Sequence, residues 1–174
     1  MSGISYAADG VGGDFYWRDC VTGNYKQEAA TAMVNASGLA ETAPRQERER
    51  MEDELLAKLD RLEAGLLRQS DKPLDVRPIW PRSPEPSFFE FRHRFDDIDD
   101  DVDGSRRGSY QALLRLYYVQ ALDFSRAMVG LHCHRKDVSD PDLVKSRQDA
   151  EIKKAVDLYS ARFGDRWGIP GFPY

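Results

Sequence analysis

The residues with the clearest chemical potential form an aspartate-rich run in the middle of the chain. Asp99, Asp101 and Asp103 reproduce the first half of a calcium-binding loop, in which alternate carboxylates converge on the ion. Gly104 follows, and a glycine there permits the sharp turn of such a loop. The second half does not match, because Tyr110 stands where a bidentate glutamate is required. A divalent-cation site at the three aspartates is therefore one interpretation, and a solvated acidic loop before a helix is the favoured one.

A second chemical pattern is the sequence His132-Cys133-His134. These residue types bind zinc or haem, and a cysteine between two histidines can also act as an activated thiolate. We expect the run to lie in a helix, where side chains two residues apart point about 200° away from each other. The two histidines could not then share one ion. The sequence therefore predicts no cofactor and no catalytic residue, and an enzyme built on Cys133 is kept only as an alternative.

The net charge of −5 is concentrated in the aspartate-rich run. The remainder of the chain sums to about +1 and has no concentrated run of lysine and arginine. Because nucleic-acid binding draws its affinity from a basic surface that displaces counterions, we expect no nucleic-acid partner. No run of about 18 apolar residues occurs, so we expect no membrane-spanning helix. The aspartates of the run are Asp96, Asp97, Asp99, Asp100, Asp101 and Asp103.

The N-terminal residues and the two cysteines bear on location. The segment from Met1 to Tyr6 lacks the basic start and apolar block of a secretory signal, and it lacks the repeated arginines of a transit peptide. We expect an intracellular location, with the mitochondrion as first choice and the cytoplasm or the cilium as alternatives. Cys20 and Cys133 lie far apart in sequence, so both are expected to be free, with one long-range disulfide as the alternative.

The strongest structural pattern lies between Ser109 and Lys136. Seven apolar residues recur there at alternating intervals of four and three, which places them along one face of an α-helix. Further apolar residues widen that surface, so we expect this long helix to be the central element of the core. The seven residues are Tyr110, Leu114, Tyr117, Ala121, Phe124, Met128 and Leu131.

Three further helices are predicted from capping signals and apolar spacing. Asn24 is a suitable N-cap and Gly38 a suitable stop, which predicts a helix from Tyr25 to Ser37. A segment dense in Glu, Arg, Leu and Ala predicts a second helix from Arg45 to Gln69. A third helix is expected from Asp142 to Phe163, where it would form an antiparallel hairpin with the central helix.

These elements predict a mainly α fold without a sheet, in which a helical hairpin and additional helices are joined by extended arms. Five prolines between Lys72 and Ser87 hold the chain extended, and four phenylalanines follow directly. We expect those phenylalanines to form a short helix or turn against the central helix. The expected segments are an extended arm at 1–23, two helices at 24–70, a Pro-rich strap with the Phe cluster and the acidic loop at 71–104, the hairpin core at 105–164 and a docking tail at 165–174.

Aromatic residues outside the expected helices suggest contacts with other proteins. A chain of this kind would expose a large apolar surface if it were alone, and aromatic side chains are enriched in interfaces. The residues expected at such interfaces are Trp17, Trp80, Phe88, Phe89, Trp167, Phe172 and Tyr174.

The sequence therefore predicts a non-catalytic accessory subunit of a large multiprotein assembly. Its partners would be other protein subunits, and a peripheral place in a mitochondrial respiratory-type or ATP synthase complex is the first choice. We do not expect self-association, because the apolar seam of the Arg45–Gln69 segment is shorter than a stable coiled coil requires. The alternatives are a structural protein associated with cytoskeletal or ciliary microtubules and a small interaction module that binds a divalent cation.

Overall fold

A computed structural model gives the structure of the chain. The described residues are 5–39, 43–69, 75–79, 87–100, 108–120 and 126–172.

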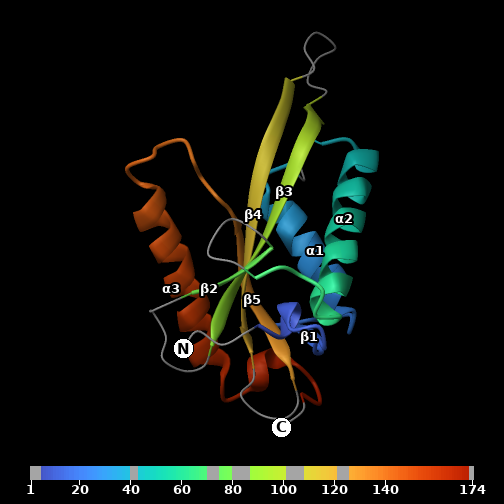
Figure 1. Cartoon of the computed structure of the whole chain (residues 1–174), viewed down its shortest axis with the longest axis vertical. Coiled ribbons are helices and arrows are strands. Elements are labelled where there is room, and N and C mark those ends of the chain that lie inside the picture. The colour runs from blue at the N-terminus through green and yellow to red at the C-terminus, as the bar shows by residue number, and fades with distance from the viewer. Residues whose placement is uncertain are drawn as a thin grey trace.

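The protein is an α/β protein built on one five-stranded mixed sheet (Figure 1). The strand order is β1-β5-β4-β3-β2. Strands β2 to β5 follow one another as antiparallel neighbours, and β1 pairs in parallel with β5 at the opposite edge. In chain order the elements are a 3-10 helix at Tyr6–Ala8, β1 at Phe15–Trp17, α1 at Tyr25–Ala36, α2 at Arg45–Glu63, β2 at Val76–Pro78, β3 at Phe88–Asp100, β4 at Gly108–Gln120, β5 at Met128–Arg135, α3 at Val144–Arg162 and a second 3-10 helix at Arg166–Gly168.

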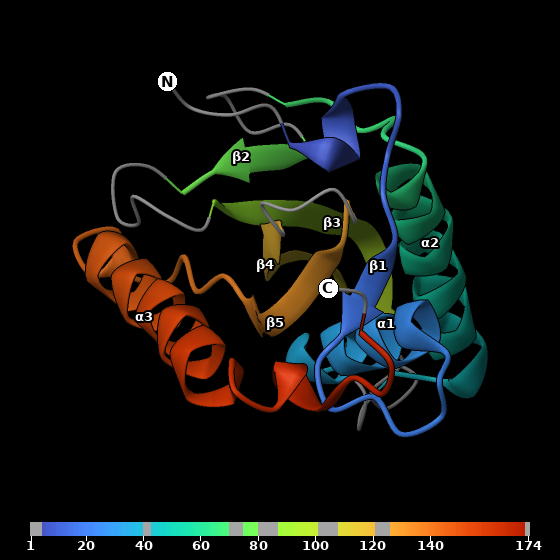
Figure 2. The same ribbon diagram turned by 90° about the horizontal axis from the view of Figure 1, so that it is seen from below.

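The sheet lies between two helical layers. Figure 2 shows α1 and α2 on one face of the sheet and α3 on the other. The two long strands β3 and β4 form a hairpin that extends beyond the helices (Figure 1). Each face of the sheet therefore has its own apolar core.

The expectation of a mainly α fold without a sheet is wrong. The segment from Ser109 to Lys136, expected to be one helix in a helical hairpin, instead contributes the antiparallel strands β4 and β5. Because the sheet is covered on both faces at residues 116–119 of β4, side chains on both faces are apolar there, and the usual alternation of polar and apolar residues is lost. A continuous apolar run of this kind resembles a buried helix in sequence.

The phenylalanine cluster also forms a strand rather than a short helix or turn. Phe89, Phe91 and Phe95 of β3 point toward α1 and α2, whereas Phe88 packs in the core beneath α3. This division follows from the period of two residues along a strand. The aromatic cluster thus supplies both cores.

The three helices in the described part of the chain agree with the sequence in type and differ in length. Asn24 caps α1 by accepting a hydrogen bond from the Gln27 backbone N–H, as expected. Helix α2 ends at Glu63 rather than at Gln69, because Gly65 adopts a positive φ of 70° and its backbone lies against Gly12. Helix α3 is confirmed, although it packs on the sheet. In the described segments, no helix combines the length and the apolar composition needed to cross a bilayer.

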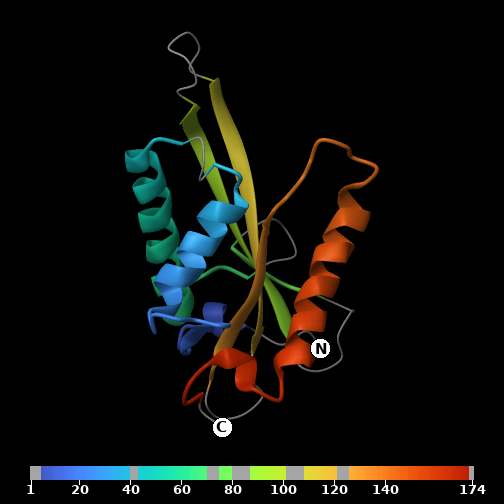
Figure 3. The same ribbon diagram turned by 180° about the vertical axis from the view of Figure 1, so that it is seen from behind.

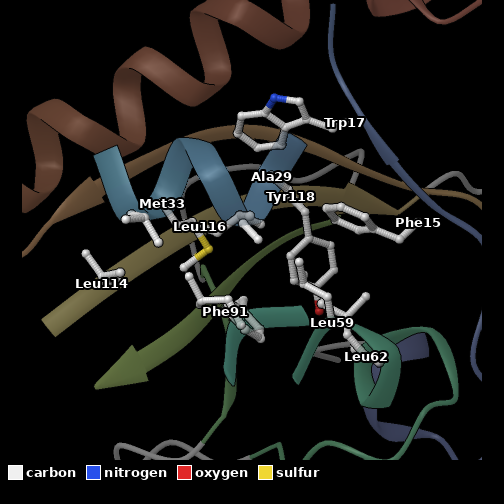
Figure 4. Packing of buried hydrophobic residues seen from close by; sticks show 14 of the residues in the cluster. Phe15, Trp17, Ala29, Met33, Leu59, Leu62, Phe91, Leu114, Leu116 and Tyr118 are labelled. Atoms are coloured by element: carbon white, nitrogen blue, oxygen red, sulfur yellow. The ribbon is translucent and has the colours of Figure 1, made fainter. Parts of the chain in front are cut away.

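The larger core lies between the sheet and the pair α1 and α2. Figure 4 shows Met33 of α1 and Leu59 of α2 pointing toward the sheet, where Phe91, Leu116 and Tyr118 meet them. All five side chains are buried. Burial of large apolar side chains is worth about 1.5 to 3 kcal/mol each, so this layer contributes heavily to stability.

The second core lies beneath α3 and includes the C-terminal residues. Trp167 and Phe172 pack against Val129 and Ile152, and the Trp167 ring N–H donates to the Tyr159 carbonyl oxygen at 3.2 Å. Figure 3 shows the C-terminal segment returning beneath the sheet after α3. The described part of the tail therefore covers the protein's own sheet.

Replacing Leu59 with Ala tests the larger core. The Leu59 side chain is fully buried, so we expect Leu59→Ala to lower the free energy of unfolding by about 2 to 5 kcal/mol. Urea denaturation followed by circular dichroism measures this change. Leu66→Ala is the matched control, because Leu66 is 58% exposed and its loss removes little buried surface. Equal destabilisation by the two variants would contradict the assignment of Leu59 to the core.

Candidate functional site

Five of the residues expected at interfaces lie inside the protein's own cores. Trp17, Phe88, Phe89, Trp167 and Phe172 are each at most 9% exposed. The exposed rings that motivated the expectation of an interface are therefore absent at these five positions. The two remaining residues, Trp80 and Tyr174, lie outside the described residues.

The aspartate-rich run begins within a strand. Asp99 belongs to β3, where its backbone pairs with Ser109, and it does not precede a helix as expected. Asp101 and Asp103 lie outside the described residues, as does the loop that would complete the cation site. In the part of the chain that is described, no three His, Cys, Asp or Glu residues are placed so that they could hold a metal ion.

The His132-Cys133-His134 run lies in β5, so the expected helical geometry is wrong. His132 pairs with Tyr117 on the face of the sheet toward α3, and His134 lies two residues further along on the same face. A register shift leaves Leu131 as the extra residue of a bulge, which turns both histidines toward α3. Cys133 points the other way, toward the larger core.

Cys133 lacks the environment of an activated thiolate. Burial raises the pKa of its thiol to about 12, and the charge of Arg18 opposes this only in part. The thiol is therefore protonated at neutral pH. Cys20 and Cys133 are both free, as the sequence predicts.

The two histidines join β5 to its neighbours. Tyr117 Oη lies 3.1 Å from His134 Nε2, and His132 Nε2 lies 2.5 Å from a carboxylate oxygen of Glu151 on α3. Burial lowers the pKa of His134, which favours the neutral ring. Although burial raises the pKa of Glu151, hydrogen bonds from Lys154 and His132 outweigh it, and the net pKa is lowered. This arrangement holds α3 on the sheet.

Next to this link lies a completely buried carboxylate, Glu90 of β3. One of its oxygens accepts from Arg92 Nε at 2.5 Å and also from Arg115 of β4, and its other oxygen accepts from Gln148 Nε2 of α3 at 3.0 Å. Arg115 is itself only 7% exposed. We call these four residues the Glu90 cluster. Glu90 is the most deeply buried charged residue among those that the structure describes.

The sheet register explains why these polar side chains share one face. Glu90 lies opposite Arg77 of β2 and Tyr117 of β4, and in the next row Arg92 lies opposite Arg115. Directly opposed residues of an antiparallel pair point to the same face. Helix α3 contacts mainly β5, so it leaves the β3 and β4 part of this face open.

A cavity of about 340 Å³ opens beside the Glu90 cluster. We call it the cationic pocket. Its walls come from α2, the segment before β2, strands β3 and β4 and the residue that follows β5. The lining residues are Lys58, Arg68, Asp75, Arg92, His93, Arg94, Leu113, Leu114, Arg115 and Lys136.

The lowered pKa of Lys136 reflects its burial and the positive charges around it. Burial lowers the pKa of its ammonium group, and the charges of Arg115, Arg92 and Arg77 lower it further, while Glu90 opposes them. A lowered pKa means that the surroundings disfavour a positive charge there. An anion bound in the pocket would favour the charged ammonium group and raise the pKa of Lys136.

Sequence reasoning missed this pocket for two reasons. The six aspartates conceal the local excess of positive charge in the overall count. The lining residues also come from segments that are distant in the chain, and they meet only because residues 92 and 115 are paired in a sheet. Basic residues at alternate positions, as at Arg92 and Arg94, were the available signal, and that signal depends on recognising a strand.

Replacing Glu90 with Gln tests the buried cluster. Glu90→Gln keeps the size of the side chain but leaves two arginines without their shared carboxylate, so we expect a loss of about 3 to 5 kcal/mol in the free energy of unfolding. Chemical denaturation measures this loss in the free energy of unfolding. Glu49→Gln is the control, since the exposed pair of Glu49 with Arg45 should contribute nothing measurable. If Glu90→Gln is as stable as the unchanged protein, Glu90 does not hold the two arginines as the structure shows.

Comparison with known proteins adds no further constraint to this geometry. No family model, no curated protein and no solved structure matches the chain.

Proposed function

We propose that the protein is a non-catalytic binding domain whose cationic pocket holds an anionic group of its ligand. The observation that carries the proposal is the concentration of like charge around one cavity. Six lysine and arginine side chains line it, together with a single carboxylate, Asp75. A concave surface of one sign attracts ligands of the opposite sign and favours their binding.

The carboxylates of the described residues neutralise only part of this charge. Asp75 pairs with Lys58 at 2.8 Å and with Arg68 at 3.4 Å. Glu90 does not line the pocket, but it pairs with Arg92 and Arg115, which do. Each carboxylate thus serves two cations, so both groups keep a net positive charge. Like charges held this close repel one another, and a bound anion would relieve the repulsion.

Lys136 adds a positive charge that the described carboxylates do not pair. It is half-buried at the junction of the cationic pocket with a second cavity of about 470 Å³. In the described segments no carboxylate forms an ion pair with it. A lysine ammonium group and arginine guanidinium groups together are the donors that proteins use to bind phosphate and carboxylate groups.

The residues of the cationic pocket favour binding over catalysis. They supply positive charge and hydrogen-bond donors, and Cys133, the thiol considered for catalysis, faces the opposite core. The role as an accessory subunit of a larger assembly and the mitochondrial location stay predictions. An anionic group on a partner subunit would be compatible with both.

Titration with small anions tests the proposal. At low ionic strength we expect phosphate or citrate to bind saturably, with a heat signal in isothermal titration calorimetry. Lys136→Gln should weaken this binding by about 10- to 150-fold, because a charge-assisted hydrogen bond is worth about 1.5 to 3 kcal/mol.

The matched control is Lys153→Gln on the exposed side of α3, where Lys153 pairs with Asp157. It removes the same charge from the protein, so it corrects for general electrostatic attraction. Failure of both anions to bind, or equal weakening by the two variants, would overturn the proposal.

A further inference from the structure

We infer that the anionic group is the dianionic phosphate of a small phosphate monoester. This inference rests on the proposed function and narrows it to one class of ligand. It follows from the charge of the pocket, the segments that supply its donors and the burial of those donors.

The charge balance favours two negative charges over one. Besides Arg94, which makes a separate interaction, five cationic side chains line the pocket, and two carboxylates, Asp75 and Glu90, pair with them. The five cationic residues are Lys58, Arg68, Arg92, Arg115 and Lys136. This pairing leaves an excess of three positive charges. A monocarboxylate or a phosphodiester would cancel one of these, whereas a phosphate monoester carries about −1.5 to −2 at pH 7.

The donors reach the pocket from three neighbouring segments. Arg92 comes from β3, Arg115 from β4 and Lys136 from the end of β5. One carboxylate oxygen of Glu90 accepts from both guanidinium groups, and each guanidinium has five N–H donors, so donors remain for a ligand. Cationic donors from three residues that line one cavity match the three terminal oxygens of a phosphate monoester better than the two oxygens of a carboxylate.

The depth of the site favours a small ligand. Arg115 lines the pocket and is almost completely buried, so a phosphate must enter the cavity to contact it. The neighbouring cavity shares Leu113 and Lys136 with the cationic pocket and continues along Asp137, Val138 and Ser139. The organic part of the ester would lie there, beside both polar and apolar side chains. The two volumes fall within the range of small-molecule sites.

The pH dependence of binding tests the dianion directly. The probes are glycerol 3-phosphate, dimethyl phosphate, acetate and sulfate, each titrated calorimetrically into the full chain at pH 5.0 and pH 7.5. Sulfate stays dianionic over this range, so its affinity reports only changes in the protein. With a second pKa of about 6, the dianionic fraction of a phosphate monoester rises about tenfold. We therefore expect the affinity for glycerol 3-phosphate, divided by that for sulfate, to rise about tenfold.

The other probes and one variant distinguish failure of this inference from failure of the proposed function. We expect dimethyl phosphate and acetate to bind at least tenfold more weakly than glycerol 3-phosphate at pH 7.5. If acetate binds as tightly as glycerol 3-phosphate, or if the affinity ratio of glycerol 3-phosphate to sulfate does not change with pH, the phosphate assignment is wrong. The pocket would then still be an anion-binding site. Absence of binding by all four probes would overturn both. Lys136→Gln, with its melting temperature checked, should remove the preference for the monoester without unfolding the protein.

Discussion

The arrangement of the pocket depends on the shared carboxylate of Glu90. This side chain is completely buried, and a buried charge is tolerated only where hydrogen bonds and opposite charges surround it. Arg92 and Arg115 supply the charge, and Gln148 supplies a further hydrogen bond from α3. The same contacts that satisfy Glu90 fix both guanidinium groups at the edge of the pocket. Stability and ligand recognition are thus coupled through one residue.

The two faces of the sheet differ in polarity. The face toward α1 and α2 carries the larger core, to which Phe91 and Tyr118 contribute. The face toward α3 is apolar only near Val129 and Trp167 and becomes polar along the rows of Glu90 and the residues beyond it. Because α3 covers mainly β5, those polar rows stay accessible from β3 and β4. The pocket lies beside these rows and also has lining residues from the other face, Lys58 of α2 and Leu114 of β4.

The sequence predicted the helices better than the sheet, for a physical reason. Local signals mark helices, as the side-chain cap at Asn24 and the polar face of α3 show. Strand β5 and residues 116–119 of β4 are covered on both faces, so their apolar residues lack the alternation that marks a strand. The pocket could not be predicted from the sequence, because Lys58, Arg115 and Lys136 meet only through the long-range pairing of the strands. The free cysteines were predictable from their spacing alone.

Nuclear magnetic resonance of the side-chain nitrogens tests the central claim most directly. Phosphate titrated into isotopically labelled protein should shift the Nε–H signals of Arg92 and Arg115 and the ammonium signal of Lys136 along one saturable curve. The signals of Arg45 and Lys153, which lie away from the pocket, should stay in place. Small, non-saturating shifts spread over all arginines and lysines would contradict an anion-binding pocket at Glu90.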